Sequence, residues 1–283
     1  MEKRLNSSAV LRELIGSINY RLAIEEITSC LKGYVDSSGS SGLVIGLSGG
    51  LDSSVAAALA VRAVGPEHVT ALIMPEKESP IGDVEDALEV ARSLRLNYLV
   101  LNITGLVEET LKLFGKTYET SEDKARGNVK ARLRMVCLYY YANANNYLVV
   151  ATSNRSEFLL GYFTKWGDGS GDIYPLLSLY KSQVRQLGRV LGLPHRVLDK
   201  PSSPALWPGQ TAQQELGLSY DVIDAALYLL VDKQMSIGEV SALLGLEEGE
   251  VSRLWRRVLE SEHKRSPLKS CPLSFSRVLT EVD

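Results

Sequence analysis

Residues 43–60, L-V-I-G-L-S-G-G-L-D-S-S-V-A-A-A-L-A, decide the fold of this chain. They begin with a short apolar run that is typical of a strand buried on both faces, and the run breaks at a glycine-rich turn. Asp52, Ser53 and Ser54 then offer N-cap chemistry to an alanine-rich helix, which we expect to pack closely against the sheet. The stretch predicts a strand, a tight turn and a helix whose N-terminus faces that turn.

The turn has the features of a phosphate-binding site. Free backbone N–H groups, the positive end of the helix dipole and glycines without side chains let a phosphate approach closely. No lysine follows the glycines as it does in a Walker loop, and Asp52 stands there instead. A carboxylate in a phosphate cradle makes sense if it holds Mg²⁺ on a polyphosphate. The alternative is an ordinary glycine-rich turn with a capping aspartate.

Beyond this stretch, apolar runs at 69–74, 98–102 and 147–152 predict three further strands, separated by segments with helical spacing. This alternation is typical of an α/β fold with an open parallel sheet and helices on both faces. Right-handed crossovers bring the carboxyl ends of the strands to the edge where ligands of such folds bind. We therefore expect the glycine-rich turn at that edge. Before the first strand, residues 9–35 predict one helix with two apolar stripes.

Length and composition limit the classes of protein to which this chain can belong. The 283 residues suffice for one large α/β domain but not for a second catalytic domain. A net charge of −3 argues against a protein that mainly neutralises a nucleic-acid backbone. Cys30, Cys137 and Cys271 form no C-x-x-C pair, so they indicate neither disulfides nor zinc and fit a reducing cytoplasm. Since no signal peptide or membrane-spanning run is visible, we expect a soluble protein without a membrane partner.

A second patterned segment, residues 150–176, belongs to the same predicted edge of the sheet. It ends a strand, continues into a short helical turn that carries Glu157, and enters a glycine-rich loop with Lys165, Asp168 and Asp172. Glu157 could be a second Mg²⁺ ligand, because Mg²⁺ in phosphate sites takes a few carboxylates in addition to phosphate oxygens. The alternative is a solvated charge in the first turn of a helix.

These motifs carry a family resemblance. S-G-G-L-D-S at 48–53 resembles the pyrophosphate loop of the N-type ATP pyrophosphatases, which split ATP between the α- and β-phosphates. Further motifs are the helix starts at 127–135 and 179–184, G-Y-F-T-K-W-G-D-G at 161–169 and E-H-K-R at 262–265. With them, the chain resembles the ammonia-dependent NAD synthetases from about residue 16 to about residue 267.

The resemblance implies which residues bind which substrate. The positions that match ATP contacts are Gly46, Leu47, Ser48, Gly49, Gly50, Leu51, Asp52, Ser53, Thr152, Lys181 and Ser203. Asp52 and Glu157 match the Mg²⁺ ligands. The positions that match contacts to deamido-NAD, the nicotinic-acid dinucleotide, are Arg132, Lys165, Asp172, His263 and Lys264. The cations among them suit a pyrophosphate and a nicotinate carboxylate. Arg134, on the same predicted helix as Arg132, stays open between a ligand contact and a salt bridge.

The resemblance also implies the chemistry and the assembly. The nicotinate carboxylate attacks the α-phosphate of ATP, pyrophosphate leaves, and ammonia displaces AMP from the nicotinyl adenylate to give NAD. No covalent enzyme nucleophile is required, since positioning and charge neutralisation supply the catalysis. The glutamine-dependent relatives carry an added amidase domain that is not visible here, so free ammonia or a separate glutaminase must supply nitrogen. The implied fold is Rossmann-like, of the adenine nucleotide alpha hydrolase type, and the implied assembly is a homodimer.

Within a single synthetase domain, 1–283, we expect an N-terminal helical segment (1–38), an ATP-pyrophosphatase core (39–200), a lid loop (201–218) and C-terminal helices with a tail (219–283). The helix at 128–143 is the expected dimer surface, where Met135, Leu138, Tyr139 and Tyr141 accompany the arginines.

The lid region departs from the family pattern. It reads K-P-S-S-P-A-L-W-P-G-Q-T-A-Q-Q-E-L-G at 200–217. Family members commonly show threonine where Ser203 lies, an acidic residue where Ala205 lies and an Asp-Glu pair where Ala212 and Gln213 lie. Either the lid tolerates these changes, or it closes differently, and Glu215 is placed to compensate.

Two other classes of protein remain as alternatives. Residues 236–257 superficially resemble a DNA-reading helix-turn-helix with arginines on its second helix. They lie inside the region matched to the synthetases, however, so a packed helical pair is favoured and no nucleic-acid partner is expected. The other alternative is a pyrophosphatase that thiolates or amidates a different acceptor. Such enzymes usually show RNA-binding domains or a working cysteine pair, and neither is visible.

Overall fold

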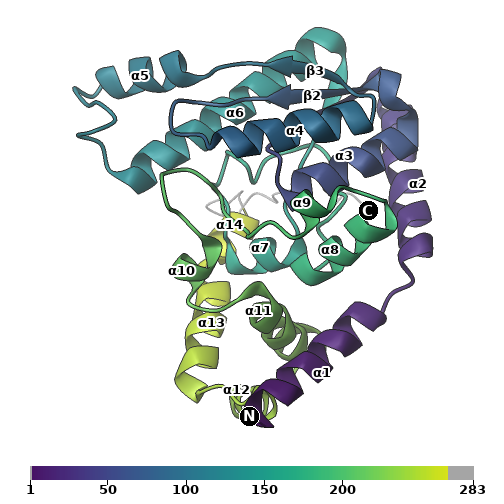
Figure 1. The fold of residues 1–283 in the computed structure, drawn as a ribbon, viewed down its shortest axis with the longest axis vertical. Helices are drawn as coiled ribbons and strands as arrows, with labels where there is room; N and C mark the ends of the chain where they lie inside the picture. The colour runs from purple at the N-terminus through teal and green to yellow at the C-terminus, as the bar shows by residue number, and fades with distance from the viewer. Residues whose placement is uncertain (1, 267–283) are drawn as a thin grey trace, which may run out of the picture.

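The computed structural model describes residues 2–266 and shows one parallel sheet flanked by helices (Figure 1). The sheet has four strands in the order β3-β2-β1-β4. Their bounds are Gly42–Gly46 for β1, Val69–Ile73 for β2, Asn97–Val100 for β3 and Tyr147–Val150 for β4. All neighbouring pairs are parallel, with Val44 opposite Thr70 on one side and Val149 on the other. The predicted parallel sheet is confirmed, and every predicted strand is present within two residues of its expected bounds.

The strand order places a topological switch beside β1. The chain runs outward from β1 to β3 and then crosses to β4 on the other side of β1. Ligands of open α/β sheets bind outside the carboxyl ends of the strands where the order reverses. Asp52 after β1 and Asn154 after β4 meet here, with Asn154 Nδ2 donating to Asp52 Oδ1 over 3.0 Å. The two segments that the sequence singles out therefore lie side by side.

Alternate residues of the buried strands face different helices, as period-two geometry requires. Leu43 and Ile45 belong to one hydrophobic cluster, whereas Val44 and Val149 belong to another on the opposite face. The first face is covered by α2 (Tyr20–Ser38), α3 (Leu51–Val64), α4 (Ile81–Ser93), α8 (Lys181–Val190) and α9 (His195–Leu198). The second is covered by α5 (Thr104–Lys112) and α6 (Asp123–Asn145). The 3₁₀ turn η1 (Pro66–His68) leads into β2.

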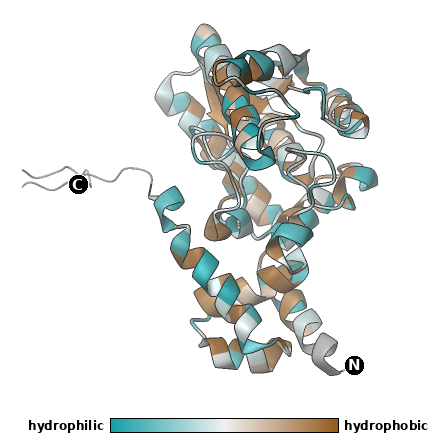
Figure 2. Ribbon diagram, turned by 90° about the vertical axis from the view of Figure 1, so that its left-hand side faces the viewer, coloured by the Kyte–Doolittle hydropathy of each residue, from teal (hydrophilic) through white to brown (hydrophobic). Residues whose placement is uncertain are grey.

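A third hydrophobic cluster lies in the helices drawn below the sheet in Figure 1. These elements are α1 (Glu2–Gly16), α7 (Arg155–Leu160), α10 (Ala212–Leu216), α11 (Tyr220–Leu227), the π-helical η2 (Tyr228–Asp232), α12 (Ile237–Leu244) and α13 (Glu248–Glu260). The short helix α14 (Glu262–Arg265) follows α13. Val240 and Leu244 of α12 and Val251 of α13 are buried in the cluster. Figure 2 shows hydrophilic and apolar residues side by side along α13, as expected for a helix with one buried face. The residues that resemble a helix-turn-helix thus form a packed helical pair.

The single helix predicted over residues 9–35 is wrong, because the chain breaks between α1 and α2. The side chain of Asn19 accepts hydrogen bonds from the backbone N–H groups of Arg21 and Leu22 and so caps a new helix. Leu14 of α1 packs with the C-terminal helices, whereas Leu31 of α2 packs on the sheet. The two apolar stripes belong to two helices with different cores.

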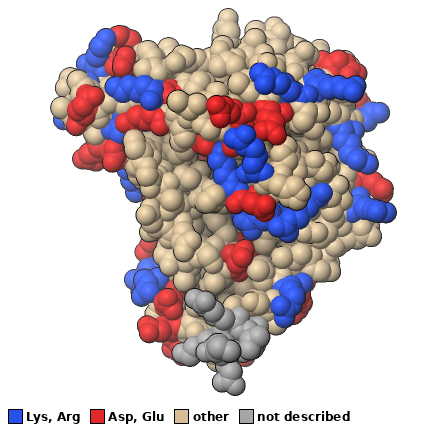
Figure 3. Space-filling view, viewed as in Figure 1, with Lys and Arg blue, Asp and Glu red and all other residues tan. Residues whose placement is uncertain are grey.

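The remaining sequence-based expectations concern hydropathy, surface charge and the cysteines. No helix within residues 2–266 is long and apolar enough to cross a membrane. Figure 3 shows acidic and basic side chains interspersed over the face in view, without a continuous basic surface. Cys30 and Cys137 are free thiols, and Cys271 lies outside the described residues.

Candidate functional site

The glycine-rich turn between β1 and α3 leaves its helix terminus open. The N-cap of α3 is Gly50, not the predicted Asp52, Ser53 or Ser54, which lie in the first turn. The Ser54 hydroxyl donates to the Gly50 carbonyl over 2.7 Å, and the Ser53 hydroxyl lies 3.0 Å from that of Ser48. No side chain caps the helix, so the first N–H groups of α3 remain available to an anion.

Gly49 is required for the shape of the turn. Its φ is +77°, and a Cβ built on it would come within 2.1 Å of the Asp83 carbonyl oxygen. A larger residue would push α4 away from the turn. Close backbone packing therefore accounts for a glycine at this position.

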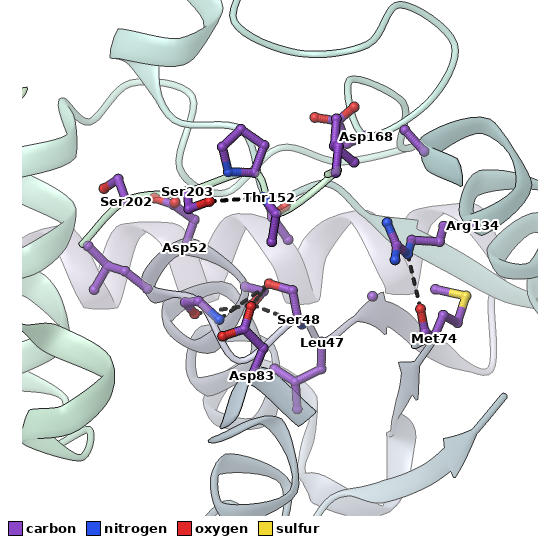
Figure 4. Close-up of a pocket in the computed structure, with 18 of the residues that line it drawn as sticks. Leu47, Ser48, Asp52, Met74, Asp83, Arg134, Thr152, Asp168, Ser202 and Ser203 are labelled. Atoms are coloured by element: carbon purple, nitrogen blue, oxygen red, sulfur yellow. Dashed lines mark hydrogen bonds between the residues drawn. The ribbon is translucent and has the colours of Figure 1, made fainter. Parts of the chain in front are cut away.

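The turn opens into a cavity of about 400 Å³, which we call the main cavity. Apart from Gly49, all the residues predicted to contact ATP or Mg²⁺ line it: Gly46, Leu47, Ser48, Gly50, Leu51, Asp52, Ser53, Thr152, Glu157, Lys181 and Ser203. Figure 4 shows Asp52, Ser202 and Ser203 at one end of this cavity and Met74 and Arg134 at the other. The main cavity is thus long and has chemically distinct ends.

At the first end, two carboxylates converge on one ammonium group. Lys181 Nζ donates to Asp52 Oδ2 and to Glu157 Oε1, the latter over 3.1 Å. Burial raises the pKa of Glu157, and nearby Asp52 adds to the effect, while Lys181 opposes it. Burial acts to lower the pKa of Lys181, but the two carboxylates outweigh it, so the net shift is upward. The same two carboxylate oxygens could also coordinate a divalent metal ion at this position.

A buried aspartate below this end holds the helices that carry Glu157 and Lys181. Asp224 of α11 accepts from the Ser156 hydroxyl over 2.5 Å and from the Ser182 backbone N–H over 2.7 Å. The Ser156 oxygen in turn accepts from the Lys181 backbone N–H over 2.9 Å. Burial raises the pKa of Asp224 to about 6 against these hydrogen bonds. The starts of α7 and α8 are therefore fixed relative to each other.

Residues 200–217, the lid segment, cover one side of the main cavity. Lys200 pairs with Asp83 over 2.5 Å and with Asp86 over 2.7 Å at the start of the segment. Further along, the Leu206 carbonyl accepts from Lys130 Nζ over 2.8 Å. Lys130 is fully buried and also pairs with Glu76 over 2.9 Å and with Glu78 over 2.6 Å. A buried ionic group thus holds the middle of the lid segment against α6.

The lid segment also contains its own hydrogen bonds. Gln210 Oε1 accepts from the Leu206 N–H over 2.9 Å, and Gln210 Nε2 donates to Glu215 over 3.0 Å. The Ser203 hydroxyl donates to the Gln210 carbonyl over 2.6 Å. Glu215 further accepts from the Tyr162 hydroxyl, which ties α10 to the end of α7. Glu215 thus supplies a carboxylate that holds the lid segment. That it compensates for the acidic residues missing at 205, 212 and 213 stays a prediction.

A second cavity, of about 440 Å³, adjoins the main cavity. Its wall includes the aromatic side chains of Phe158, Phe163, Trp166 and Tyr174 together with Lys165 and Lys264. Met135 and Ser170 line both cavities. An aromatic, cationic pocket next to the main cavity suits a ring compound that carries negative charge.

Comparison with known proteins shows to which family the chain belongs. A family model described as NAD synthase matches residues 23–268. The chain belongs to the NAD synthase family. An NH(3)-dependent NAD(+) synthetase from Hyperthermus butylicus is 46% identical over 257 residues, which are 90% of this chain and 92% of that protein. Another from Thermococcus kodakarensis is 47% identical over 249 residues, covering 88% and 96%.

Solved structures of NAD synthase relatives agree with the fold. An NMN synthetase from Francisella tularensis superposes with a TM-score of 0.77 at 36% identity, covering 91% of this chain and all of that one. An NH3-dependent NAD synthetase from Campylobacter jejuni, in complex with the nitrate ion, gives 0.75 at 30% identity, covering 92% and 100%. The family and the fold class inferred from the sequence motifs are thus confirmed.

The residues predicted to contact deamido-NAD do not all line a cavity, whereas nearly all of those predicted to contact ATP do. Lys165 and Lys264 line the second cavity, but both donate to backbone carbonyls, Lys165 to that of His263 over 2.8 Å and Lys264 to that of Gly161 over 2.6 Å. Arg132, Asp172 and His263 line neither cavity. Arg132 is exposed and donates to the Lys165 carbonyl over 3.3 Å.

Asp172 acts within the fold. It accepts from the Val149 backbone N–H over 2.7 Å and from the Tyr139 hydroxyl over 3.1 Å, and it thereby ties the loop after α7 to β4 and α6. The predictions of ligand contact for Arg132, Asp172 and His263 stay predictions.

Sequence reasoning missed Asn154 and Asp224 and left Arg134 undecided. Asn154 caps α7 in a capping box with Glu157 and also binds Asp52, so N-x-x-E after a strand was a usable signal. Asp224 had no such signal, because its partners are 42 and 68 residues away along the chain.

Proposed function

We propose that this chain amidates deamido-NAD with ammonia and ATP to give NAD, AMP and pyrophosphate through a nicotinyl adenylate. The observation that carries the proposal is the main cavity, where an uncapped helix terminus and the group formed by Asp52, Glu157 and Lys181 meet beside an aromatic, cationic second cavity. The first feature suits a polyphosphate, and the second suits the nicotinate half of a dinucleotide.

The donor set at the phosphate end fits Mg²⁺. Asp52 and Glu157 supply carboxylate oxygens around the site that Lys181 Nζ now shares. No group of three or more metal-binding side chains occurs in the described part of the chain. Mg²⁺ in phosphate sites takes one or two carboxylates and completes its shell with phosphate oxygens and water, so Asp52 and Glu157 would be enough to hold it. When bound, the ion would neutralise charge on the polyphosphate.

The residues of the chain have clear tasks in such a reaction. The N–H groups at the start of α3 hold the leaving pyrophosphate, and Lys181 supports its charge. Met135 and Ser170 line both cavities, and we expect a carboxylate in the second cavity to meet the α-phosphate of an ATP in the main cavity at this boundary. Catalysis is then mainly positioning, which agrees with the lack of any need for a covalent nucleophile.

The decisive experiment is a matched incubation of the purified chain with ATP, Mg²⁺, ammonium and an acceptor. With deamido-NAD we expect AMP, pyrophosphate and NAD in equal amounts. Nicotinate mononucleotide is the matched alternative acceptor, because one structural neighbour is described as an NMN synthetase. Faster amidation of the mononucleotide would replace the proposed substrate. Glutamine in place of ammonium should give almost no NAD, and efficient glutamine use would contradict the proposed nitrogen source.

We further propose a cytoplasmic homodimer. Support comes from α6, where Val136 is 55% and Tyr140 is 77% exposed beside exposed Arg132. The apolar residues expected at this surface are partly buried: Leu138, Tyr139 and Tyr141 pack against the core of the monomer and Met135 lines the cavities. Their part in a dimer surface stays a prediction. Light scattering on Tyr140→Glu should show monomers, with Leu113→Glu, an exposed site on the far end of α5, as control. An unchanged mass would contradict this interface.

A further inference from the structure

The main cavity has three cationic side chains, and two of them form ion pairs. Lys181 pairs with Asp52 and Glu157, and Lys200 pairs with Asp83 and Asp86. The third, Arg134, forms no ion pair with any of residues 2–266. Its Nε donates to the Met74 carbonyl over 3.1 Å, and Figure 4 shows the guanidinium facing the cavity. Of the two alternatives left open for Arg134, the salt bridge thus finds no partner within 4 Å among the described residues.

Apolar groups surround Arg134 at its end of the cavity. Leu138 follows it by one helical turn on α6 and so shares its face. A Cβ built on Gly46 would lie 3.5 Å from Leu138 and 3.6 Å from the Met74 methyl group, so the end of β1 closes this end of the cavity. Leu72 and Ala131 complete the lining. Burial lowers the pKa of the Arg134 guanidinium, which nevertheless stays charged at neutral pH.

We propose that Arg134 contacts the nucleoside of ATP and is a determinant of affinity for the adenine base. The proposal rests on the proposed function, since it assumes ATP in the main cavity. The polyphosphate belongs at the opposite end, where the open helix terminus, Asp52 and Lys181 lie. An apolar slot of this kind is unsuited to phosphates but suits a flat purine, and a guanidinium stacks on such a ring or donates to its nitrogens.

The hydrogen bond to Met74 gives the guanidinium a fixed orientation. With Nε engaged, the terminal amino groups remain as donors toward the cavity. A lysine at position 134 would keep the charge but would lose the planar surface and the bond geometry. Arg134 is thus distinguishable from a group that simply adds positive potential to the cavity.

The test compares a nucleotide with its phosphate chain alone. Calorimetry with Mg²⁺ would measure binding of α,β-methylene ATP and of tripolyphosphate to the wild type and to Arg134→Ala. We expect the variant to bind the nucleotide about 10- to 100-fold more weakly and to bind tripolyphosphate within about twofold of the wild type. In turnover, KM for ATP should rise similarly while kcat at saturating ATP and KM for deamido-NAD change little.

Two further variants complete the design. Arg134→Lys should resemble Arg134→Ala toward the nucleotide, which also covers the case that the alanine variant fails to fold. Arg62→Gln, at an exposed arginine of α3, should behave as the wild type. Equal weakening of nucleotide and tripolyphosphate, full affinity in Arg134→Lys, or a rise in KM for deamido-NAD alone would each overturn the proposal. Because analogue binding needs no reaction, it fails or succeeds independently of the amidation assay.

Discussion

The glycine-rich turn and the lid segment border the same cavity but are held in different ways. The turn is fixed by short-range contacts among Ser48, Gly50, Ser53 and Ser54 and by the packing of Gly49 on α4. The lid segment depends on a few side chains, chiefly Lys130 and Gln210. The turn is thus held by many local contacts, whereas the lid segment is held by a few side-chain contacts that single substitutions can break.

The largest effect on activity is expected at the glycine-rich turn. Asp52→Asn should lower deamido-NAD-dependent AMP formation by about 10³-fold or more, because it removes a charge from the proposed metal and phosphate site without opening the core. Release of AMP and pyrophosphate would be measured beside circular dichroism. Asp36→Asn, an exposed position on α2, is the control. Near-normal turnover of Asp52→Asn at limiting Mg²⁺ would show that the metal assignment is wrong.

The next effect concerns the ionic group beneath the lid segment. Lys130→Met should lower the free energy of unfolding by about 3–5 kcal/mol, because it takes the buried cation away from Glu76 and leaves Glu78 with Arg126 alone. Urea unfolding would measure the change. Adding Glu76→Gln should recover part of the loss, since it removes one of the stranded charges. If the double variant were as unstable as the single one, the charge explanation would not hold.

The free energy of unfolding is expected to depend on pH through Asp224, which fixes the starts of α7 and α8. Its pKa is about 6 in the fold against a usual 3.8, so the folded state holds the proton more tightly than the unfolded chain. As pH rises from about 4 to about 6, this group should therefore lower the free energy of unfolding, by at most about 3 kcal/mol. Asp224→Asn should lack that slope in urea unfolding at several pH values. Parallel pH curves for the two proteins would argue against it.

The smallest effect is local to the lid segment. Gln210→Ala removes the acceptor for the Leu206 N–H and a donor to Glu215, so amides in residues 200–217 should exchange hydrogen about 5- to 10-fold faster. Mass spectrometry would compare them with the glycine-rich turn, where exchange should not change. Gln213→Ala, at an exposed glutamine of the same segment, serves as control. Faster exchange in both regions would mean that they are not held independently.

Local sequence determined much of this protein. The strand, turn and helix of residues 43–60 and the parallel sheet followed from short patterns, because hydrophobic period and turn chemistry act between near neighbours. Thr152, Lys181 and Ser203 were expected at the main cavity only because of the family resemblance, and they line it. Local reasoning failed at the break between α1 and α2, where one helical period continues across two helices that pack on different cores. It also chose the wrong residue as the cap of α3, since several polar side chains there could serve.

Only the tertiary structure decided how distant residues meet. Asp224 reaches Ser156 across 68 residues, and Lys130 reaches Leu206 across 76. It also decided that Arg134 faces the cavity unpaired while Arg132, two residues away, is exposed at the surface. A helix turns by about 100° per residue, so such neighbours point apart. Which of them meets a ligand depends on what the rest of the fold packs against each face.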